Sequence, residues 1–371
     1  LAAGTNIVGT VFGGNKADVT DNTLNINTNA QAGNIKNFET IKLTLKSGAF
    51  NPANSLLRLT GGTQTTNLDW SKLEVDTTAL TAAPKSYEAY RVKLMENANG
   101  ISFMKGATNT YASHGAKERT QGDLEYVIDT DNHTANAANS IDLEAYQFQN
   151  KQNAAFTAAD GTKAEAWGGR TKVGNKVQNN KLTVSGGTLT QAAYGGLAEN
   201  FKRDDHGNLK TTGDAEKNSL ILNAGANTLN AYGAQVRTKS GSAADNTATL
   251  NAGTVNGSLY GASLSAAGAT GSATKNKVEI KGGAVTGSVY GSHIADGAAT
   301  GNATASTVTV TGGTVAGDIY AGFTNGSGAT TGNTVNLGDG EHSLAAGTNI
   351  TGTIHGGNKA DATDNTLNIN T

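Results

Sequence analysis

Apolar and polar residues alternate over short stretches along most of the chain, as in KVEI at 277–280, TVTV at 307–310 and SVYGS at 288–292. Alternation with a period of two over four to eight residues is typical of a half-buried β-strand. The Val, Ile and Thr residues in these stretches favour the same extended conformation. Because a clear helical period of 3.6 residues is missing, the pattern predicts an all-β fold of short strands joined by tight corners.

The strands belong to a repeat of about 30 residues, in which an aromatic residue follows the first apolar position by twelve residues. Five copies of this motif occupy residues 182–194, 220–232, 248–260, 278–290 and 308–320. One repeat alone cannot bury its apolar face, but stacked repeats can, with each strand pairing in parallel with its equivalent in the next repeat. The sequence therefore predicts a parallel β-helix, or β-solenoid, with one coil per repeat.

Equivalent side chains of stacked coils lie above one another, so the aromatic position predicts a ladder of rings. Its members are Trp167, Tyr194, Tyr232, Tyr260, Tyr290 and Tyr320. We interpret the ladder as structural, since a stacked aromatic pair contributes about 0.5–1.5 kcal/mol beyond its burial. A platform on the outer face on which sugars stack is the alternative interpretation.

A second repetition has a much longer period. Residues 1–28 recur as residues 344–371 with four differences, Val8/Thr351, Val11/Ile354, Phe12/His355 and Val19/Ala362. Since 344 − 1 = 343, the sequence contains one super-repeat of 343 residues and the opening of the next. We therefore expect a segment of a longer tandem array, and we predict that neighbouring copies associate end to end.

These patterns divide the sequence into three regions. Residues 1–45 and 166–371 are predicted to form solenoid coils, with 344–371 beginning the next super-repeat, whereas residues 46–165 carry bulkier side chains, both Pro and both Met. The sequence of this middle region predicts degenerate coils, in which Leu57, Leu59 and Trp70 match the repeat motif imperfectly. It also predicts strands near 90–97, 101–106, 123–131 and 140–148, which we interpret as a protruding β-rich insertion. Protrusions are where recognition usually occurs.

Composition narrows the possible partners. The chain has 49 Gly but 2 Pro and no Cys, so neither disulfides nor thiolate metal sites are expected. A net charge of −2 gives no basic field for nucleic acid or an anionic membrane. No stretch reaches 18 apolar residues, and LAAGTNIVGT at the start lacks the basic and apolar regions of a signal peptide.

Candidate chemistry is sparse in the sequence. Glu279, Asp318 and Asp339 are scattered over different coils, so we predict no catalytic residue, although stacking could bring distant acids together. The segment from Asp129 through Asp131 to His133 resembles the start of a calcium loop. It fails the pattern, because Thr134 and Ser140 stand where glycine and glutamate are required. The run Asp204, Asp205 and His206 is interpreted as a polar loop tip. No cofactor or metal is predicted.

The stretches GGAVTGSVYGS at 282–292, GGTVAGDIYAG at 312–322 and GNIKNFETIKL at 33–43 resemble the repeats of large Gram-negative surface adhesins. These are the passenger domains of autotransporters and the filamentous-haemagglutinin-like exoproteins. The resemblance implies a right-handed parallel β-helix displayed outside the cell, or anchored at the outer membrane, as a stalk, adhesin or fibre. It carries no binding residue over to a numbered position here.

Our leading hypothesis is a structural and adhesive bacterial surface protein. Its expected partners are neighbouring copies of itself and a host or bacterial surface protein or glycan. The first alternative is a polysaccharide-active lyase or hydrolase built on a β-helix. The second alternative is an ice- or surface-binding solenoid, suggested by the Thr residues of TLNINT and TVTVTGG, but the Thr positions drift between repeats.

Overall fold

A computed structural model shows that the chain folds into two compact units. The residues that the structure describes are 4–15, 21–46, 55–62, 73–79, 84–102, 104–105, 109–110, 117–121, 124–130, 137–147, 153–200, 211–360 and 362–370. Unit 1 draws its described residues from 4–84 and 88–146, and unit 2 from 85–87, 147–200 and 211–370. The boundary predicted between 165 and 166 falls inside unit 2, within strand β14 (Thr162–Thr171), and that between 45 and 46 falls inside unit 1.

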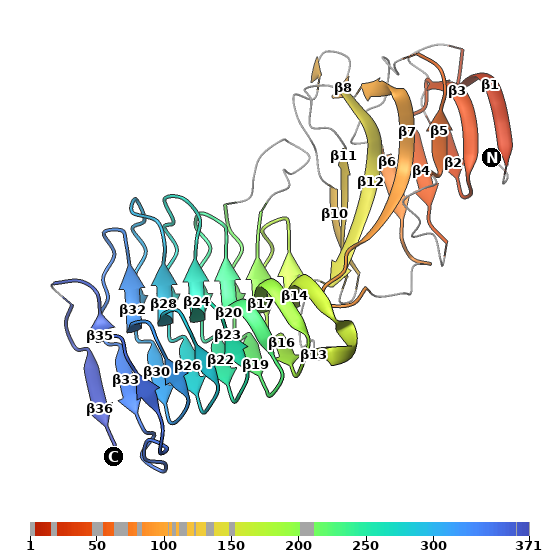
Figure 1. Cartoon of the computed structure of the whole chain (residues 1–371). Helices are drawn as coiled ribbons and strands as arrows, with labels where there is room; N and C mark the ends of the chain where they lie inside the picture. The colour runs from red at the N-terminus through yellow and green to blue at the C-terminus, as the bar shows by residue number, and fades with distance from the viewer. Residues whose placement is uncertain are drawn as a thin grey trace. The chain divides into compact units, whose positions relative to one another are not determined.

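Unit 1 contains a seven-stranded sheet in the order β1-β3-β5-β7-β12-β11-β10 and a three-stranded sheet in the order β2-β4-β6 (Figure 1). Strands of the large sheet are β1 (Thr5–Phe12), β3 (Ala30–Lys36), β5 (Leu57–Leu59), β7 (Tyr90–Ser102), β10 (Lys117–Gln121), β11 (Leu124–Thr130) and β12 (Ala137–Gln147). Those of the small sheet are β2 (Thr23–Ile26), β4 (Thr40–Thr44) and β6 (Leu73–Asp76). A short pair, β8 (Met104–Lys105) and β9 (Asn109–Thr110), completes the described strands of the unit.

The direction of pairing changes within unit 1. Strands β1, β3, β5 and β7 are parallel, whereas β7 pairs with β12 and β10 pairs with β11 in antiparallel fashion. Strands expected from the bulky side chains of the middle region are present as β7, β8, β11 and β12. Their antiparallel pairing was not predicted, because alternation of apolar residues reports which face is buried and not the direction of the neighbouring strand.

Unit 2 consists of parallel sheets to which successive repeats contribute equivalent strands (Figure 1). The eight-stranded sheet comprises β13 (Asn153–Phe156), β16 (Lys181–Val184), β19 (Ser219–Leu222), β22 (Thr247–Leu250), β26 (Lys277–Ile280), β30 (Thr307–Val310), β33 (Thr334–Leu337) and β36 (Thr366–Ile369). The five-stranded sheet comprises β15 (Val177–Gln178), β18 (Ala215–Glu216), β21 (Ala243–Ala244), β25 (Ala273–Thr274) and β29 (Ala303–Thr304).

An eleven-stranded sheet carries the predicted aromatic positions. Its longer strands are β14, β17 (Thr188–Ala198), β20 (Asn227–Val236), β24 (Leu259–Leu264), β28 (Val289–Ile294), β32 (Ile319–Thr324) and β35 (Ile354–Gly357). Its two-residue strands are β23 (Thr254–Val255), β27 (Ala284–Val285), β31 (Thr314–Val315) and β34 (Asn349–Ile350). The one helical element among the described residues is the 3-10 turn η2 (Ala158–Asp160). The fold is therefore all-β with long parallel sheets, as predicted.

Apolar positions of equivalent strands form the core of unit 2. Val278 of β26 lies in register with Val308 of β30, as the sequence predicted, and both side chains are fully buried. Thr309, between two inward-facing positions of β30, faces outward and is half-buried. Alternation in the sequence thus corresponds directly to the two faces of each sheet.

A row of asparagines stabilises the corners before the strands of the eight-stranded sheet from β16 to β36. Its buried members are Asn180, Asn218, Asn246, Asn276 and Asn333, with Ser306 taking one place, and the half-buried Asn365 ends the row. The backbone N–H of one member donates to the side-chain oxygen of the next, and three successive side-chain amides do the same. This row was not predicted, although Asn recurs two positions before the first apolar residue of the strands.

The residue preceding each member of the row has a left-handed backbone conformation. Such residues are Asn179, Lys217, Asp245, Lys275, Ala305 and Asp364, with φ between 54° and 58°, and Gly332, with φ 65°. A Cβ atom disfavours this conformation, and asparagine and aspartate tolerate it better than other non-glycine residues. The corner therefore retains some backbone strain where Lys or Ala occupies it.

Ala305→Gly is expected to raise the free energy of unfolding by about 0.5–1 kcal/mol, because glycine adopts positive φ without steric cost. Ala305 is exposed and has φ 55°, so its methyl group contributes little packing. Ala303→Gly is the matched control, because Ala303 is a fully buried strand residue two positions earlier. The loss of its methyl group should lower the free energy of unfolding. Urea titrations measure both, and a decrease in both variants would contradict the strain argument.

Candidate functional site

Trp167 and the five predicted tyrosines occupy equivalent positions in successive strands of the eleven-stranded sheet, each in register with the next. From Tyr194 to Tyr320 the ring centroids are 5.2, 4.6, 5.0 and 5.5 Å apart, and no pair of rings is tilted by more than 15°. His355 extends the row, 4.5 Å from Tyr320. His355 was not predicted as a member of the row, although Phe12 at the same place in the other copy was a signal.

Stacking occupies the faces of the rings. Tyr232, Tyr260 and Tyr290 each have a tyrosine against both faces, so only ring edges and hydroxyl groups remain for solvent. A sugar ring stacks on an open aromatic face. The geometry of the row therefore fits a structural role better than a platform for sugars.

Two consecutive buried residues follow each tyrosine of the row, and the first of them is glycine in most repeats. A Cβ on Gly261 would meet the carbonyl oxygen of Gly291 and would lie 2.9 Å from that of Lys277. These two buried residues break the alternation of the strand, so the third residue after Tyr290 and after Tyr320 forms a second half-buried position. His293 and Phe323 occupy this second position, with ring centroids 4.7 and 5.0 Å from those of Tyr290 and Tyr320. This second row was not predicted.

His293 lies among uncharged groups. Its ring stacks on Phe323 at 5.2 Å and contacts Tyr260 and Tyr290, and its Nδ1 lies 3.2 Å from the hydroxyl of Ser263. Burial lowers the pKa of His293 to about 4, because the charged imidazolium would lose its hydration. The imidazole is therefore neutral in the folded chain at neutral pH.

His293 should make the folded chain sensitive to acid. Between its pKa of about 4 in the folded state and about 6.5 in the unfolded state, the unfolded chain binds more protons, so stability rises with pH in this window. On acidification from pH 7 to 4.5, the wild type should lose about 2–3 kcal/mol more stability than His293→Phe, which keeps an aromatic ring in the row. Urea titrations at the two pH values test this, and parallel losses would contradict it.

A cluster of charged side chains adjoins the first rungs of the ladder. Glu165 and Arg170 lie on β14, Glu199 directly follows β17, and Arg237 directly follows β20. The Glu199 side chain is fully buried, and its oxygens accept hydrogen bonds from Arg170 Nε at 2.7 Å and from Arg237 Nη1. Tyr194 Oη accepts from Arg237 Nη2 at 2.9 Å and donates to Glu165 Oε1 at 3.1 Å.

The electrostatics of this cluster favour fixed charges. Burial raises the pKa of the Tyr194 hydroxyl well above its usual range. Burial acts to lower the pKa of Arg237, but Tyr194 and the carboxylates of Glu199 and Glu165 outweigh it, so that this pKa is raised. Two guanidinium groups balance two carboxylates, and the phenol stays protonated. An acid or base of a polysaccharide-active enzyme must exchange a proton, so the cluster fits an ion network that fixes the strands better than catalysis.

Spacing in the sequence explains why this cluster was not predicted. Its members come from three repeats and meet only when the strand register is known. Arg170 also lies over the Trp167 ring, with 4.7 Å from the guanidinium carbon to the ring centroid. The signal in the sequence was the presence of Glu and Arg in repeats that otherwise hold few charges.

The three acids considered in the sequence analysis do not form a cluster. Glu279 pairs with Lys281 at 3.2 Å, Asp318 accepts from the backbone N–H of Thr353, and Asp339 accepts from that of His342. Among the described residues no group of three or more His, Asp or Glu is placed to hold a metal ion.

Several residues considered earlier are not described. Trp70, Asp131, His133, Asp204, Asp205 and His206 lie outside the described residues. Asp129 lies in β11, without a described side chain. Within the described ranges, no helix has both the length and the apolar character needed to cross a membrane.

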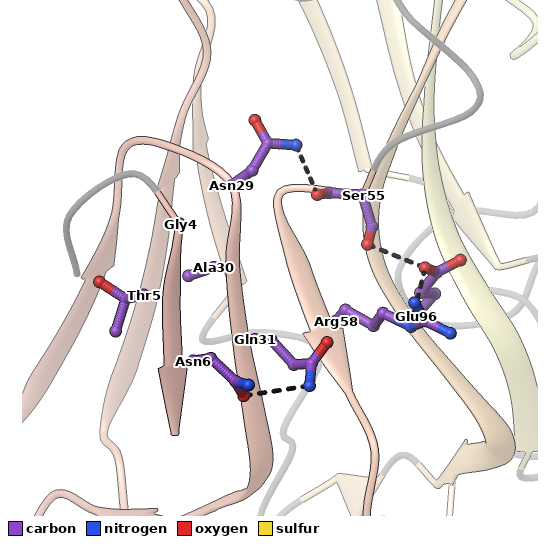
Figure 2. Close-up of a pocket in the computed structure, with 9 residues that line it drawn as sticks. All are labelled: Gly4, Thr5, Asn6, Asn29, Ala30, Gln31, Ser55, Arg58 and Glu96. Carbon is purple, nitrogen blue, oxygen red and sulfur yellow. Dashed lines mark hydrogen bonds and ion pairs between the residues drawn. The ribbon is translucent and has the colours of Figure 1, made fainter. Parts of the chain in front are cut away.

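Unit 1 holds a polar pocket of about 310 Å³ across β1, β3, β5 and β7 (Figure 2). Asn6, Gln31, Arg58 and Glu96 are direct neighbours across these four strands. Gln31 Nε2 donates to Asn6 Oδ1 at 3.1 Å, and Arg58 Nε lies 3.7 Å from Glu96 Oε1. Figure 2 shows this row with Asn29 and Ser55 along one side of it.

Further hydrogen bonds fix the side chains around the pocket. Asn29 Nδ2 donates to the carbonyl of Ser55 at 2.9 Å, and the Ser55 hydroxyl donates to Glu96 Oε1 at 3.1 Å. Amides, a guanidinium and a carboxylate thus follow one another at the strand separation of ~4.8 Å. Such a row of donors and acceptors is suited to the hydroxyl groups of a carbohydrate. No binding residue was predicted here from the sequence.

Comparison with known proteins gives no relatives for this chain. No protein-family model matches it, and the searches of curated proteins and of solved structures each found no match. Its class therefore rests on the fold and on the sites described above.

Proposed function

We propose that the chain is one unit of a tandem-repeat β-solenoid that forms an extended structural and adhesive protein on a bacterial surface. In this proposal the stacked repeats form a right-handed parallel β-helix. Support comes from unit 2, in which equivalent strands of successive repeats pair in parallel along each sheet. Connections between parallel strands of one sheet are right-handed in about 98% of cases.

One observation carries the proposal: the two copies of the 28-residue segment, which differ at four positions, pair on opposite sides. In the copy at 344–371, strands β34, β35 and β36 pair with β31, β32 and β33 of the preceding repeat. In the copy at 1–28, strands β1 and β2 pair with β3 and β4, which follow in the sequence. A coil of this sequence can therefore pair on each of its two sides.

The two sets of partners join without conflict. Leu367 is in register with Val335, and its equivalent Leu24 is in register with Ile41. In a tandem chain one such leucine would lie between a valine of the preceding super-repeat and an isoleucine of its own. The sheets would then run on from one super-repeat into the next, which suits a stalk or fibre.

Chains with one, two and three super-repeats test this proposal. We expect rods of constant width in electron micrographs, with equal increments of length per super-repeat. Compact particles whose length does not grow in this way would overturn the proposal. Circular dichroism of each chain serves as the control for folding.

We place the adhesive function at the pocket of unit 1 and propose a carbohydrate as its ligand. Three of its residues, Ser55, Arg58 and Glu96, belong to the middle region, and Glu96 lies on a strand of the insertion for which recognition was predicted. The pocket lies on the outer face of parallel strands, so continuation of the solenoid would leave it open to solvent. A tandem array would repeat this site once per super-repeat, and even weak sites then bind strongly to a polymeric glycan.

Arg58→Ala is expected to weaken binding to an array of bacterial and host glycans at least tenfold, because the guanidinium supplies charged donors at the centre of the pocket. Arg91→Ala is the matched control, since Arg58 and Arg91 have the same side-chain exposure of 62% and each pairs with one glutamate. Arg91 does not line the pocket. Equal binding by both variants, or no glycan retained by the wild type, would contradict this site.

A further inference from the structure

We propose that the pocket of unit 1 selects glycans that carry a carboxylate, as uronic and sialic acids do, and that Arg58 binds this group. The inference rests on the carbohydrate site proposed above and identifies the chemical class of its ligand. A neutral sugar offers only hydroxyl groups and ring oxygens. An acidic sugar adds a planar anion, which a guanidinium group binds with two parallel hydrogen bonds.

Arg58 has a guanidinium group that the fold leaves almost unused. Its Nε lies 3.7 Å from Glu96 Oε1, which is beyond hydrogen-bond distance, and its side chain is 62% exposed. Among the described residues, none accepts a hydrogen bond from this guanidinium. An ion pair as exposed as this one contributes little to stability. The terminal nitrogens of Arg58 are therefore available to a ligand.

The carboxylate of Glu96 is satisfied by other groups. Its Oε1 accepts a hydrogen bond from the Ser55 hydroxyl at 3.1 Å, and its Oε2 accepts one from Lys93 Nζ at 3.0 Å. Lys93 and Glu96 are 31% and 26% exposed, so the two less exposed ions pair with each other. Since Lys93 balances the charge of Glu96, the positive charge of Arg58 has no counterion of its own. The pocket therefore attracts an anion.

Neutral hydrogen-bonding groups lie on the other side of Arg58. In Figure 2, Arg58 lies between Glu96 and Gln31, and Gln31 is in register with Asn6. The bond from Gln31 Nε2 to Asn6 Oδ1 leaves Gln31 Oε1 and Asn6 Nδ2 without a partner among the described residues. An acceptor beside a donor suits sugar hydroxyl groups, which can do both. Because neighbouring strands are ~4.8 Å apart, one acidic sugar can contact both Arg58 and Gln31.

Glu96 also limits the kind of anion that fits. Its carboxylate lies beside the guanidinium, so an anion on Arg58 is close to a second negative charge. A phosphate monoester carries nearly two negative charges at neutral pH and is repelled more strongly than a carboxylate, which carries one. The pocket therefore fits a carboxylated sugar better than a phosphorylated one.

Ligands that differ only in the carboxylate test the inference on the unaltered chain. An oligogalacturonate is compared with its methyl ester, and sialyllactose with its methyl ester, by isothermal titration calorimetry at low ionic strength. We expect at least one acid to bind about tenfold more tightly than its ester, since charge-assisted bonds are about twice as strong as neutral ones. The pair that shows this distinguishes a uronic from a sialic acid. Equal affinities within both pairs would overturn the inference.

The kind of anion is tested on a single sugar ring. Galacturonic acid, galactose 6-sulfate and galactose 6-phosphate carry a carboxylate, a sulfate and a phosphate at the same carbon, and galactose carries no charge. We expect galacturonic acid to bind most tightly of the four in ligand-observed nuclear magnetic resonance. Tighter binding of the sulfate or of the phosphate would contradict the choice of a carboxylate.

Variants that remove one charge show which side chain recognises the carboxylate. Arg58→Gln should reduce the ratio of acid to ester affinity to about one, whereas Glu96→Gln should raise it several-fold by removing the neighbouring negative charge. Arg91→Gln should leave the ratio at its wild-type value, because Arg91 is equally exposed and paired but does not line the pocket. Circular dichroism establishes that each variant is folded. An unchanged ratio in Arg58→Gln would overturn the inference.

Salt dependence separates recognition of charge from a structural role of Arg58. A structural role predicts that Arg58→Gln weakens acid and ester alike, so that their ratio stays the same. Raising the ionic strength from about 0.01 M to about 0.15 M shortens the Debye length from about 30 Å to about 8 Å. The wild type should then bind the acid several-fold more weakly and the ester as before. An acid affinity that salt does not change would count against the proposal.

The results also distinguish this inference from the proposed carbohydrate site. If neutral glycans bind and Arg58→Ala weakens them, while acids bind no better than their esters, the inference falls and the site stands. If the wild type retains no glycan of either kind, both fall.

Discussion

Asn246→Ala is expected to lower the free energy of unfolding of unit 2 by about 3–5 kcal/mol, because it leaves several buried polar groups unpaired at about 1–3 kcal/mol each. The side-chain oxygen of Asn246 accepts from the backbone N–H and the amide of Asn218. Its amide donates to the carbonyl of Ala215 at 2.9 Å and to Asn276 Oδ1 at 3.0 Å. The change removes all four of these bonds inside a dry corner.

Asn251→Ala is the matched control for this prediction. Asn251 donates to Asn223 Oδ1 at 2.9 Å in the same way, one repeat to the next, but the pair is exposed to water. Its loss should change stability by less than about 0.5 kcal/mol. Urea titrations followed by far-ultraviolet circular dichroism compare the two variants. Equal effects would mean that the buried row contributes no more than the exposed one.

Gly261→Ala should lower the free energy of unfolding by about 3 kcal/mol or more, about as much as Asn246→Ala. The reason is that overpacking at a backbone contact cannot be relieved by moving a side chain. Three backbone atoms surround the position of the added methyl group: the oxygen of Gly291 and the oxygen and nitrogen of Lys277, the last two at 2.9 and 3.0 Å. These atoms belong to two different sheets of the next repeat. Relief therefore requires the sheets to separate.

The tyrosine row offers a local readout for this variant. Because Gly261 follows Tyr260 directly, displacement of the strand should weaken the near-ultraviolet circular dichroism of the stacked rings. Gly297→Ala serves as the control, since no atom lies within 4 Å of an added Cβ there. Its stability should stay within about 0.5 kcal/mol of the wild type. If Gly261→Ala kept the spectrum and the stability of the wild type, the two sheets would be able to separate without loss of stability, and the prediction would be wrong.

Much of unit 2 could be predicted because one pattern recurs in successive repeats. A spacing of twelve residues from the first apolar position to the tyrosine gives both the strand and the register of the next repeat. Val278 on Val308 and Tyr290 on Tyr320 follow from it directly. The buried asparagines obey the same spacing. They were not predicted, because an asparagine just before a strand is as typical of a solvated turn as of a buried corner.

Other features depend on information that alternation does not contain. The contact of Glu199 with Arg170 and Arg237 requires three repeats in register, and the residues that make it occur in single repeats. Antiparallel pairing of β7 with β12 depends on the path of the chain between them. The pocket of unit 1 arises where Asn6, Gln31 and Arg58 align across strands of different length, a match that no single strand reveals.

Each repeat of unit 2 bonds chiefly to the repeats before and after it. This arrangement has a mechanical consequence. Tension on the two ends of such a stack acts on the terminal repeat first, while the repeats behind it keep their neighbours. Each repeat that peels away releases roughly 30 residues, or about 100 Å of extended chain. A surface tether built in this way would lengthen in steps under flow and would limit the force on whatever it holds.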